Sequence, residues 1–373
     1  MLTRALGLVS LISLVGCGGP VVVPGEDASV DAGATTRDAG TADAGGGDSG
    51  TPDAGSVDSG TPGDAGLIDS GTPGDAGLID SGTPGDAGSV DSGVRDAGIP
   101  GVDGGTYRNS LAVCWTDATC QRVFAVAHGG AWDAINLPYD SDGALAAAYA
   151  AGIDGVKIDV RVTADNVPVI SHSSPLQLYE SIDCYNRVIE TSTAAQVTAC
   201  HRAPSSTEKF QRLDTVLEYL RGKMVVQLTV KRQVDYARVI QQIHAQNAED
   251  FAFMEISTSD LQTLIPPIPG SGSIWYLINV ASTLSEVDTL LTLNNPRAFM
   301  YEFDPTVNVS TLTSARLHPA GIRTFTYDRS ATLSQAQIKT YFDTGFDVVS
   351  TQLATNAVNA RKQVNTARGV TPP

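Results

Sequence analysis

The chain has 373 residues and a formal net charge of −17. Sixteen acidic residues and only two arginines lie between positions 18 and 104, so most of the negative charge lies outside the C-terminal part. This charge is not that of a basic nucleic-acid-binding protein, and we expect no nucleic-acid partner. It says little about the ligand of the C-terminal part.

The N-terminal residues have the pattern of an export signal. Arg4 precedes a mostly apolar run at positions 5–15, which is too short to cross a bilayer as a helix. Leu14-Val15-Gly16 before Cys17 resembles a bacterial lipobox, which implies removal of residues 1–16 and a diacylglyceryl group on Cys17. We therefore expect an exported lipoprotein, anchored to a membrane through Cys17, in the outer membrane, the periplasm or on the cell surface. An ordinary signal peptide with an incidental cysteine is the alternative.

Residues 17–104 are predicted to be a disordered linker. Gly, Asp, Ala, Ser, Thr and Pro dominate their composition, and the unit SGTPGDAGLID occurs twice from Ser59, followed by the variant SGTPGDAGSVD. Such a segment has too few apolar side chains to offset the entropy of ordering it. Calcium-binding repeats are the alternative, but they need large apolar residues at fixed positions. As a flexible coil, the linker would reach roughly 50 Å.

Residues 105–373 are long enough for one large domain, which we expect to be monomeric. They contain four cysteines, and an even number in an exported protein suggests disulfides. Three pairings are possible, and proximity in the sequence favours Cys114 with Cys120 and Cys184 with Cys200. A zinc site is the alternative, but no C-x-x-C pair is present.

After Arg122, apolar β-branched runs alternate with segments of helical spacing. The runs predict eight strands, at 123–127, 156–160, 225–230, 251–256, 274–280, 298–303, 323–327 and 347–351. The helical segments lie at 144–151, 213–220, 236–243 and before Phe342, the last opening with Thr332 and Gln335 as a capping box. Gly152, Gly222 and Gly345 stand where helices should end.

Eight strands with intervening helices predict a parallel (β/α)8 TIM barrel, preceded by the disordered linker. An open doubly wound sheet is the alternative, although no Gly-x-Gly-x-x-Gly or phosphate-loop motif supports a nucleotide-binding version. In a barrel the chemistry gathers at the C-terminal ends of the strands. Polar candidates there are His128, Lys157, Asp159, Lys231 and His172, the last closing a run at 167–171 that should fold back beside strand two.

At these residues the sequence resembles the glycerophosphodiester phosphodiesterase family, among the phospholipase C-like barrels. The resemblance spans nearly the whole domain and preserves order and spacing. It rests on AHGG at 127–130, PYDS at 138–141, GIDGVKIDV at 152–160, the run from Thr163 to His172-Ser173, and Thr351-Gln352. The family implies hydrolysis of a phosphodiester, and therefore a small phosphodiester or phospholipid headgroup as the partner.

The departures from the family pattern concern its divalent cation. Tyr139, Lys157 and Thr229 stand where the family has glutamates, and of that acidic set Asp159 remains. Because a hard cation needs several oxygen ligands, we expect no cofactor. The alternative is a calcium or magnesium ion held in an unconventional site by Glu255, Glu302 and Asp304.

The remaining residues still suit phosphodiester cleavage. Two imidazoles, at His128 and His172, are able to take and give protons near neutral pH, and Asp159 lies between them in the sequence. An ammonium group at Lys157 or Lys231 is able to stabilise the phosphoryl charge in place of a cation. Three lost acids would equally be expected of a decayed site. The alternative function is therefore a catalytically inactive barrel, acting as a surface-tethered binding lipoprotein.

Overall fold

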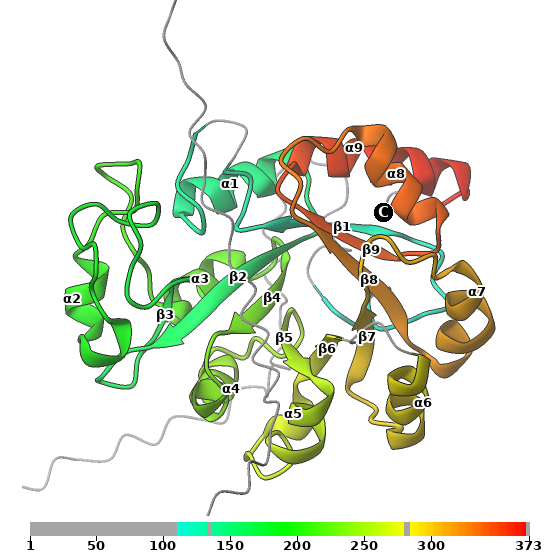
Figure 1. Cartoon of the computed structure of the whole chain (residues 1–373), viewed down its shortest axis with the longest axis horizontal. Helices are drawn as coiled ribbons and strands as arrows, with labels where there is room; N and C mark the ends of the chain where they lie inside the picture. The colour runs from blue at the N-terminus through cyan, green and yellow to red at the C-terminus, as the bar shows by residue number, and fades with distance from the viewer. Residues whose placement is uncertain (1–109, 113, 133–135, 280–283, 371–373) are drawn as a thin grey trace, which may run out of the picture. The chain divides into compact units, whose positions relative to one another are not determined.

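The computed structural model describes residues 110–112, 114–132, 136–279 and 284–370 (Figure 1). The signal peptide, the lipidated Cys17 and the repeat-bearing linker predicted for residues 1–104 lie outside the described residues. Within the described ranges, no helix is both long enough and apolar enough to cross a membrane.

Eight parallel strands close into a barrel, in the order β1-β9-β8-β7-β6-β5-β4-β2, with β2 pairing back onto β1. Each overlaps one predicted run, so the predicted TIM barrel is confirmed and the open sheet is wrong. β3 (Pro168–Ile170) folds back antiparallel to β2, as predicted. The barrel strands are β1 (Phe124–His128), β2 (Gly155–Val162), β4 (Val225–Val230), β5 (Ala252–Ser257), β6 (Trp275–Asn279), β7 (Ala298–Glu302), β8 (Arg323–Asp328) and β9 (Val348–Thr351).

Helices surround the barrel, except α2, which lies apart from it on the side of β3 (Figure 1). They are α1 (Asp142–Ala151), α2 (Ala194–Thr198), α3 (Leu213–Leu220), α4 (Tyr236–Ala245), α5 (Thr258–Thr263), α6 (Leu284–Leu293), α7 (Ser310–Leu312), α8 (Gln335–Asp343) and α9 (Ala354–Ala367). Helix α1 ends at Gly152, whose φ of 90° suits a residue without a side chain.

The capping box of α8 differs from the prediction by two residues. Ser334 and Gln337 form it, not Thr332 and Gln335. The reason is packing: Leu333 and Ile338 are both buried, one before the cap and one in the first turn. This apolar pair fixes where the chain enters the helix, so the residue after Leu333 becomes the cap.

The barrel interior is apolar toward the N-terminal ends of the strands and polar at their C-terminal ends, which we call the mouth. Alternate residues of each strand point inward. Phe124, Val225, Phe253, Leu277, Phe325 and Val348 share one buried cluster with Trp115, which stacks on Phe124 at a ring distance of 4.2 Å. Further along, in the same alternation, come His128, Thr229, Glu255 and Tyr327. The strand period therefore places these polar groups at the mouth.

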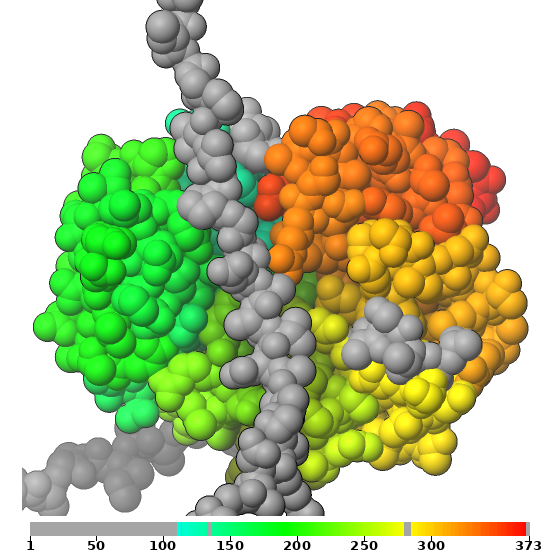
Figure 2. Space-filling model, in the orientation of Figure 1, coloured from blue at the N-terminus to red at the C-terminus, as the bar shows by residue number. Residues whose placement is uncertain are grey.

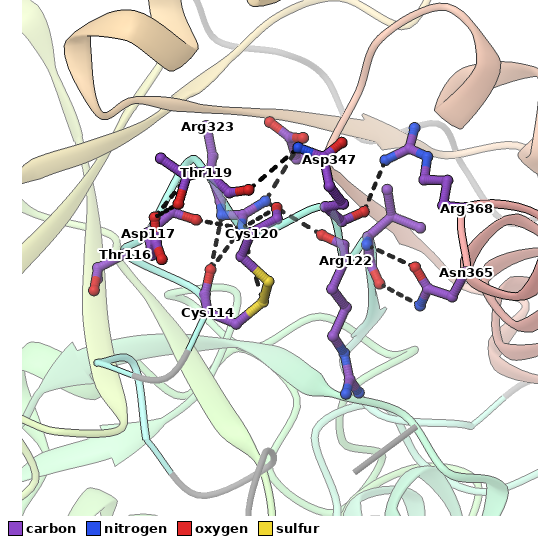
Figure 3. Close-up of a disulfide and its surroundings, with 12 residues drawn as sticks. Cys114, Thr116, Asp117, Thr119, Cys120, Arg122, Arg323, Asp347, Asn365 and Arg368 are labelled. Carbon is purple, nitrogen blue, oxygen red and sulfur yellow. Dashed lines mark hydrogen bonds and ion pairs between the residues drawn. A yellow bond between two sulfur atoms is a disulfide. The ribbon is translucent and has the colours of Figure 1, made fainter. Parts of the chain in front are cut away.

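A disulfide loop closes the floor of the barrel, at the end opposite the mouth. Cys114 pairs with Cys120, as predicted. Arg323, fully buried at the start of β8, donates to the carbonyl oxygens of Cys114 and Asp117 at 2.6 Å and of Cys120 at 3.0 Å (Figure 3). Its guanidinium also lies 3.6 Å from Asp347. Arg323 thus ties the segment before β1 to the barrel floor.

An insertion between β3 and α3, residues 171–212, forms a lobe beside β2 (Figure 1). It contains α2 and the Cys184–Cys200 disulfide, so the second predicted pairing is also present. The lobe has its own buried apolar cluster, which includes Leu176, Ile189, Val197 and Phe210. The chain there has enough core to hold a defined conformation.

Candidate active site at the barrel mouth

Asp159 is the centre of the polar cluster at the mouth. It is fully buried on β2, and its Oδ1 accepts from Lys157 Nζ at 2.5 Å and lies 2.8 Å from Lys231 Nζ. Its Oδ2 accepts from the Tyr139 hydroxyl at 2.7 Å. Lys157 Nζ also donates to the Tyr139 hydroxyl at 3.3 Å. Two ammonium groups and a phenol therefore surround one carboxylate.

Within this cluster, the lysines and Asp159 keep one another ionised. Burial alone would raise the pKa of Asp159, but the ammonium groups of Lys157 and Lys231 hold it well below its ordinary value. Burial would likewise lower the pKa of Lys157, and Asp159 raises it above the ordinary value instead. The neighbouring Asp140 differs, because burial and then the charge of Asp159 raise its pKa to about 8. Lys157 and Asp159 are thus an ionised pair at neutral pH.

His128 lies at the end of β1, where its ring stacks on Tyr327 of β8 at 4.3 Å. Its Nε2 lies 3.5 Å from the Tyr139 hydroxyl, and its buried Nδ1 has no hydrogen-bond partner among the described residues. Burial, followed by the charge of Lys157, lowers the pKa of His128 well below 6.5. The imidazole is therefore neutral near neutral pH.

His172 follows β3 and is positioned by the insertion. Its backbone N–H donates to Glu180 Oε1 at 3.0 Å, and its Nδ1 lies 3.0 Å from the Tyr179 hydroxyl. The ring of Tyr139 lies between the two histidines, with centroids 5.3 Å from His128 and 6.4 Å from His172. Both imidazoles therefore pack against Tyr139, whose hydroxyl is bonded to Asp159, and Asp159 also holds Lys157 and Lys231.

The mouth does not fit the divalent cation that the family pattern implies. Within the described ranges, no three histidine, cysteine, aspartate or glutamate side chains gather as ligands for a metal ion. Both oxygens of Asp159 are engaged by Lys157, Lys231 and Tyr139, and an ammonium group repels a second cation. In the family pattern, Lys157 stands where an acidic ligand is expected.

The three later acids do not replace the lost ligands. Glu255 accepts from Gln227 at 2.9 Å and from Thr229 at 2.6 Å. Asp304 is exposed and accepts from the Thr306 hydroxyl at 2.5 Å. Burial, and then the charge of Glu255, raises the pKa of Glu302 well above its ordinary value.

Two site residues were not anticipated in their present roles. The family pattern marks Tyr139 only as a replaced ligand, yet it joins Asp159, Lys157 and His128. No motif marks Tyr327. Its place in the inward alternation of β8, after Arg323 and Phe325, is the signal that would have identified it. Trp132, which follows β1, donates from its indole to the His128 carbonyl at 3.0 Å.

Comparison with known proteins agrees with the barrel fold. Residues 134–260 match the glycerophosphoryl diester phosphodiesterase family. A phosphodiesterase of that name from Parabacteroides distasonis has 16% identity and a TM-score of 0.55, over 65% of this chain and 88% of its own. An Agrobacterium tumefaciens glycerophosphodiester phosphodiesterase has 18% identity and a TM-score of 0.51, over 64% and 99%.

A third similar structure contains a ligand. It is an Oleispira antarctica phosphodiesterase in complex with the product sn-glycerol-3-phosphate, with 16% identity and a TM-score of 0.51, over 66% of this chain and 99% of its own. At such identities the structural similarity establishes the fold. Among curated proteins, none matches this sequence.

Proposed function

We propose that this barrel, whose residues 134–260 match the glycerophosphoryl diester phosphodiesterase family, hydrolyses a phosphodiester that carries a hydroxyl group beside the phosphate. A glycerophosphodiester or a phospholipid headgroup has this chemistry. The observation that carries the proposal is the convergence of His128 and His172 on the Lys157–Asp159–Lys231 cluster. The glycerol phosphate bound to the Oleispira relative supports a small phosphodiester substrate.

The proposed reaction needs one base and one acid. Neutral His128 takes the proton of the adjacent hydroxyl, whose oxygen then bonds to phosphorus. As the bond from phosphorus to the leaving oxygen breaks, His172 gives that oxygen a proton. A cyclic phosphodiester and an alcohol result, and water then opens the ring. Tyr139, between the two imidazoles, holds Asp159 in place through its hydroxyl.

The two lysines supply the charge stabilisation in this scheme. Lys157 is buried on β2, and Lys231 is one-fifth exposed just after β4. Asp159 fixes both ammonium groups at one point of the mouth, which pre-organises them for the negative charge of the phosphoryl oxygens. No step of the scheme is routed through a metal ion.

We expect excess EDTA to leave the turnover of a glycerophosphodiester unchanged, because Lys157 and Lys231 surround the one retained acid. Lys157→Met should lower that turnover by about tenfold, less than the usual loss for an oxyanion-stabilising donor, because Lys231 remains. The measurement is product release with EDTA, calcium or magnesium. Turnover that requires an added cation would contradict the scheme.

The pH profile should reflect the neutral state of His128. Because burial and Lys157 lower its pKa below 6.5, kcat/KM should show no loss as the pH falls through 6.5 and should decline only below the folded-state pKa. The free energy of unfolding should change with pH in the same direction. The contribution of neutral His128 is fully present above pH 6.5 and is lost as the pH falls toward the folded-state pKa, because His128 of the unfolded chain binds its proton first. Profiles between about pH 5 and 8 test this. An acid limb that begins at or above 6.5 would show that another group is the base.

A barrel that binds a phosphodiester without cleaving it is the second candidate. The observation in its favour is the tight pairing of Lys157 and Lys231 with Asp159, which leaves each ammonium group partly neutralised. This function predicts binding at the mouth, but no turnover of any diester with EDTA, calcium or magnesium. Measurement of product release with EDTA, calcium or magnesium separates the two candidate functions.

We also propose that the domain is exported and anchored through Cys17. The lipobox-like residues before Cys17 support this, as do two disulfides, which persist in oxidising compartments. Cys17→Ser should move the protein from the membrane fraction to the soluble fraction on sedimentation of cell extracts. If the variant still sediments with membranes, Cys17 is not the anchor.

A further inference from the structure

Exposed large apolar side chains are concentrated on the insertion lobe. The described residues contain eight of them, and five lie within an eleven-residue stretch. We call these five the apolar rim: Leu178, Tyr179, Ile182, Tyr185 and Val188, between 37% and 71% exposed. Figure 2 shows the lobe, in green, as one side of the molecule. Val234, 73% exposed, lies two residues after Arg232, whose guanidinium is 3.8 Å from Glu190 of the lobe.

The lobe does not expose these side chains for lack of a core. Leu176, Ile189, Val197 and Phe210 fill its interior and are at most 2% exposed. The Cys184–Cys200 disulfide and a hydrogen bond from Ser181 to the His201 carbonyl at 2.8 Å hold the stretch in place. An exposed apolar patch on a rigid support is typical of a binding surface.

The apolar rim is joined directly to the proposed acid of the reaction. The Tyr179 hydroxyl lies 3.0 Å from His172 Nδ1 and 2.9 Å from Ser173 Oγ. The next residue, Glu180, is 3% exposed and accepts from the backbone N–H groups of His172 and Ser173. A molecule that spans the distance from His172 to the rim therefore crosses Tyr179 first.

The charges on the rim are compatible with a neutral apolar occupant. Glu180 is buried against the backbone of His172 and Ser173, Asp183 pairs with His201 at 2.8 Å, and Arg187 is half-buried. An aliphatic chain needs no charged partner, and it gains free energy in proportion to the apolar area that leaves water.

We propose that the apolar rim binds the aliphatic chain of a phosphodiester lipid, with the chain carried by the leaving alcohol. This inference rests on the proposed function, in which His172 protonates the leaving oxygen. It narrows the substrate to an amphiphile whose hydroxyl-bearing headgroup lies at His128 and whose chain passes over Tyr179. Bond formation and bond cleavage are those already given, and the released product is the alcohol that bears the chain.

Two substrates with the same headgroup test this inference: long-chain lysophosphatidylglycerol, and glycerophosphoglycerol, which has no chain. The protein is the full chain with Cys17→Ser, which removes the proposed anchor. Leu178→Ser together with Ile182→Ser should lower the ratio of kcat/KM for the long-chain substrate to that for the chainless one by at least about tenfold. The reason is that two side chains would no longer bury apolar area against the bound aliphatic chain. Leu293→Ser, at the end of α6 and 41% exposed, is the matched control and should leave the ratio at the wild-type value. An unchanged ratio in the double variant overturns the inference.

A binding measurement separates this inference from the proposed function. If neither substrate is turned over, the proposed function fails, but equilibrium binding of lysophosphatidylglycerol still tests the rim. Weaker binding by the double variant than by Leu293→Ser supports the inference, and equal binding overturns it. Sedimentation velocity tests whether the apolar rim instead binds a second copy of the chain. A wild-type dimer that the double substitution dissociates, with lipid binding unaltered, would assign the rim to self-association and overturn the inference.

Discussion

Replacement of His128 by alanine should lower phosphodiester turnover by at least about 10², the usual scale for losing a general base. The ring is buried at the mouth, stacked on Tyr327, and its pKa is held low by burial and by Lys157. It is therefore the neutral base that the proposed reaction requires. His172→Ala should cause a loss of the same order, because the leaving oxygen would depart without a proton. Initial rates on a glycerophosphodiester provide the measurement.

The control for His128→Ala is a histidine on the outside of the barrel. His244 lies on α4, with Nδ1 paired to Glu249 at 2.5 Å and Nε2 3.1 Å from the Gly270 carbonyl. His244→Ala should keep the wild-type turnover. Equal losses at His128 and His244 would indicate a general effect on the fold, and near-wild-type turnover in His128→Ala would assign the base to another residue.

Arg323→Met should lower the free energy of unfolding by about 3–5 kcal/mol. This is the expected cost of removing one member of a buried ion pair, because the charge of Asp347 would remain buried without its partner. Arg323 is fully buried, and its loss leaves the carbonyl oxygens of Cys114, Asp117 and Cys120 without their donor. Asp347 would also lose its guanidinium neighbour on the floor. Denaturant unfolding, followed by circular dichroism under non-reducing conditions, provides the measurement.

A surface arginine is the control for Arg323. Arg316 pairs with Asp288, and both side chains are more than a third exposed. Arg316→Met should lower the free energy of unfolding by less than about 1 kcal/mol, because solvent screens exposed ion pairs. If both substitutions cost the same, the contacts of Arg323 to the disulfide loop contribute little to stability.

Local features of the sequence were sufficient for the elements of the fold. A strand or a helix depends on neighbours a few residues away, so β-branched runs predict β4 at 225–230 and helical spacing predicts α3 at 213–220. The two disulfides also close short loops, between residues 6 and 16 positions apart, and proximity was enough to choose them. The family motifs placed His128, Asp159 and His172 because they lie within one continuous stretch of the chain.

The contacts between distant segments were decided by the tertiary structure alone. Closure of the barrel stacks Tyr327 of β8 on His128 of β1, and the pairing of β2 with β4 brings Lys231 to Asp159. The α8 cap was predicted two residues early because burial of Leu333 and Ile338, not the spacing of polar residues, fixes where that helix begins. Strand alternation sets which side chains point inward, but register between strands sets their height in the barrel. Register depends on hydrogen bonds and packing between residues far apart in the chain, which a local pattern does not contain.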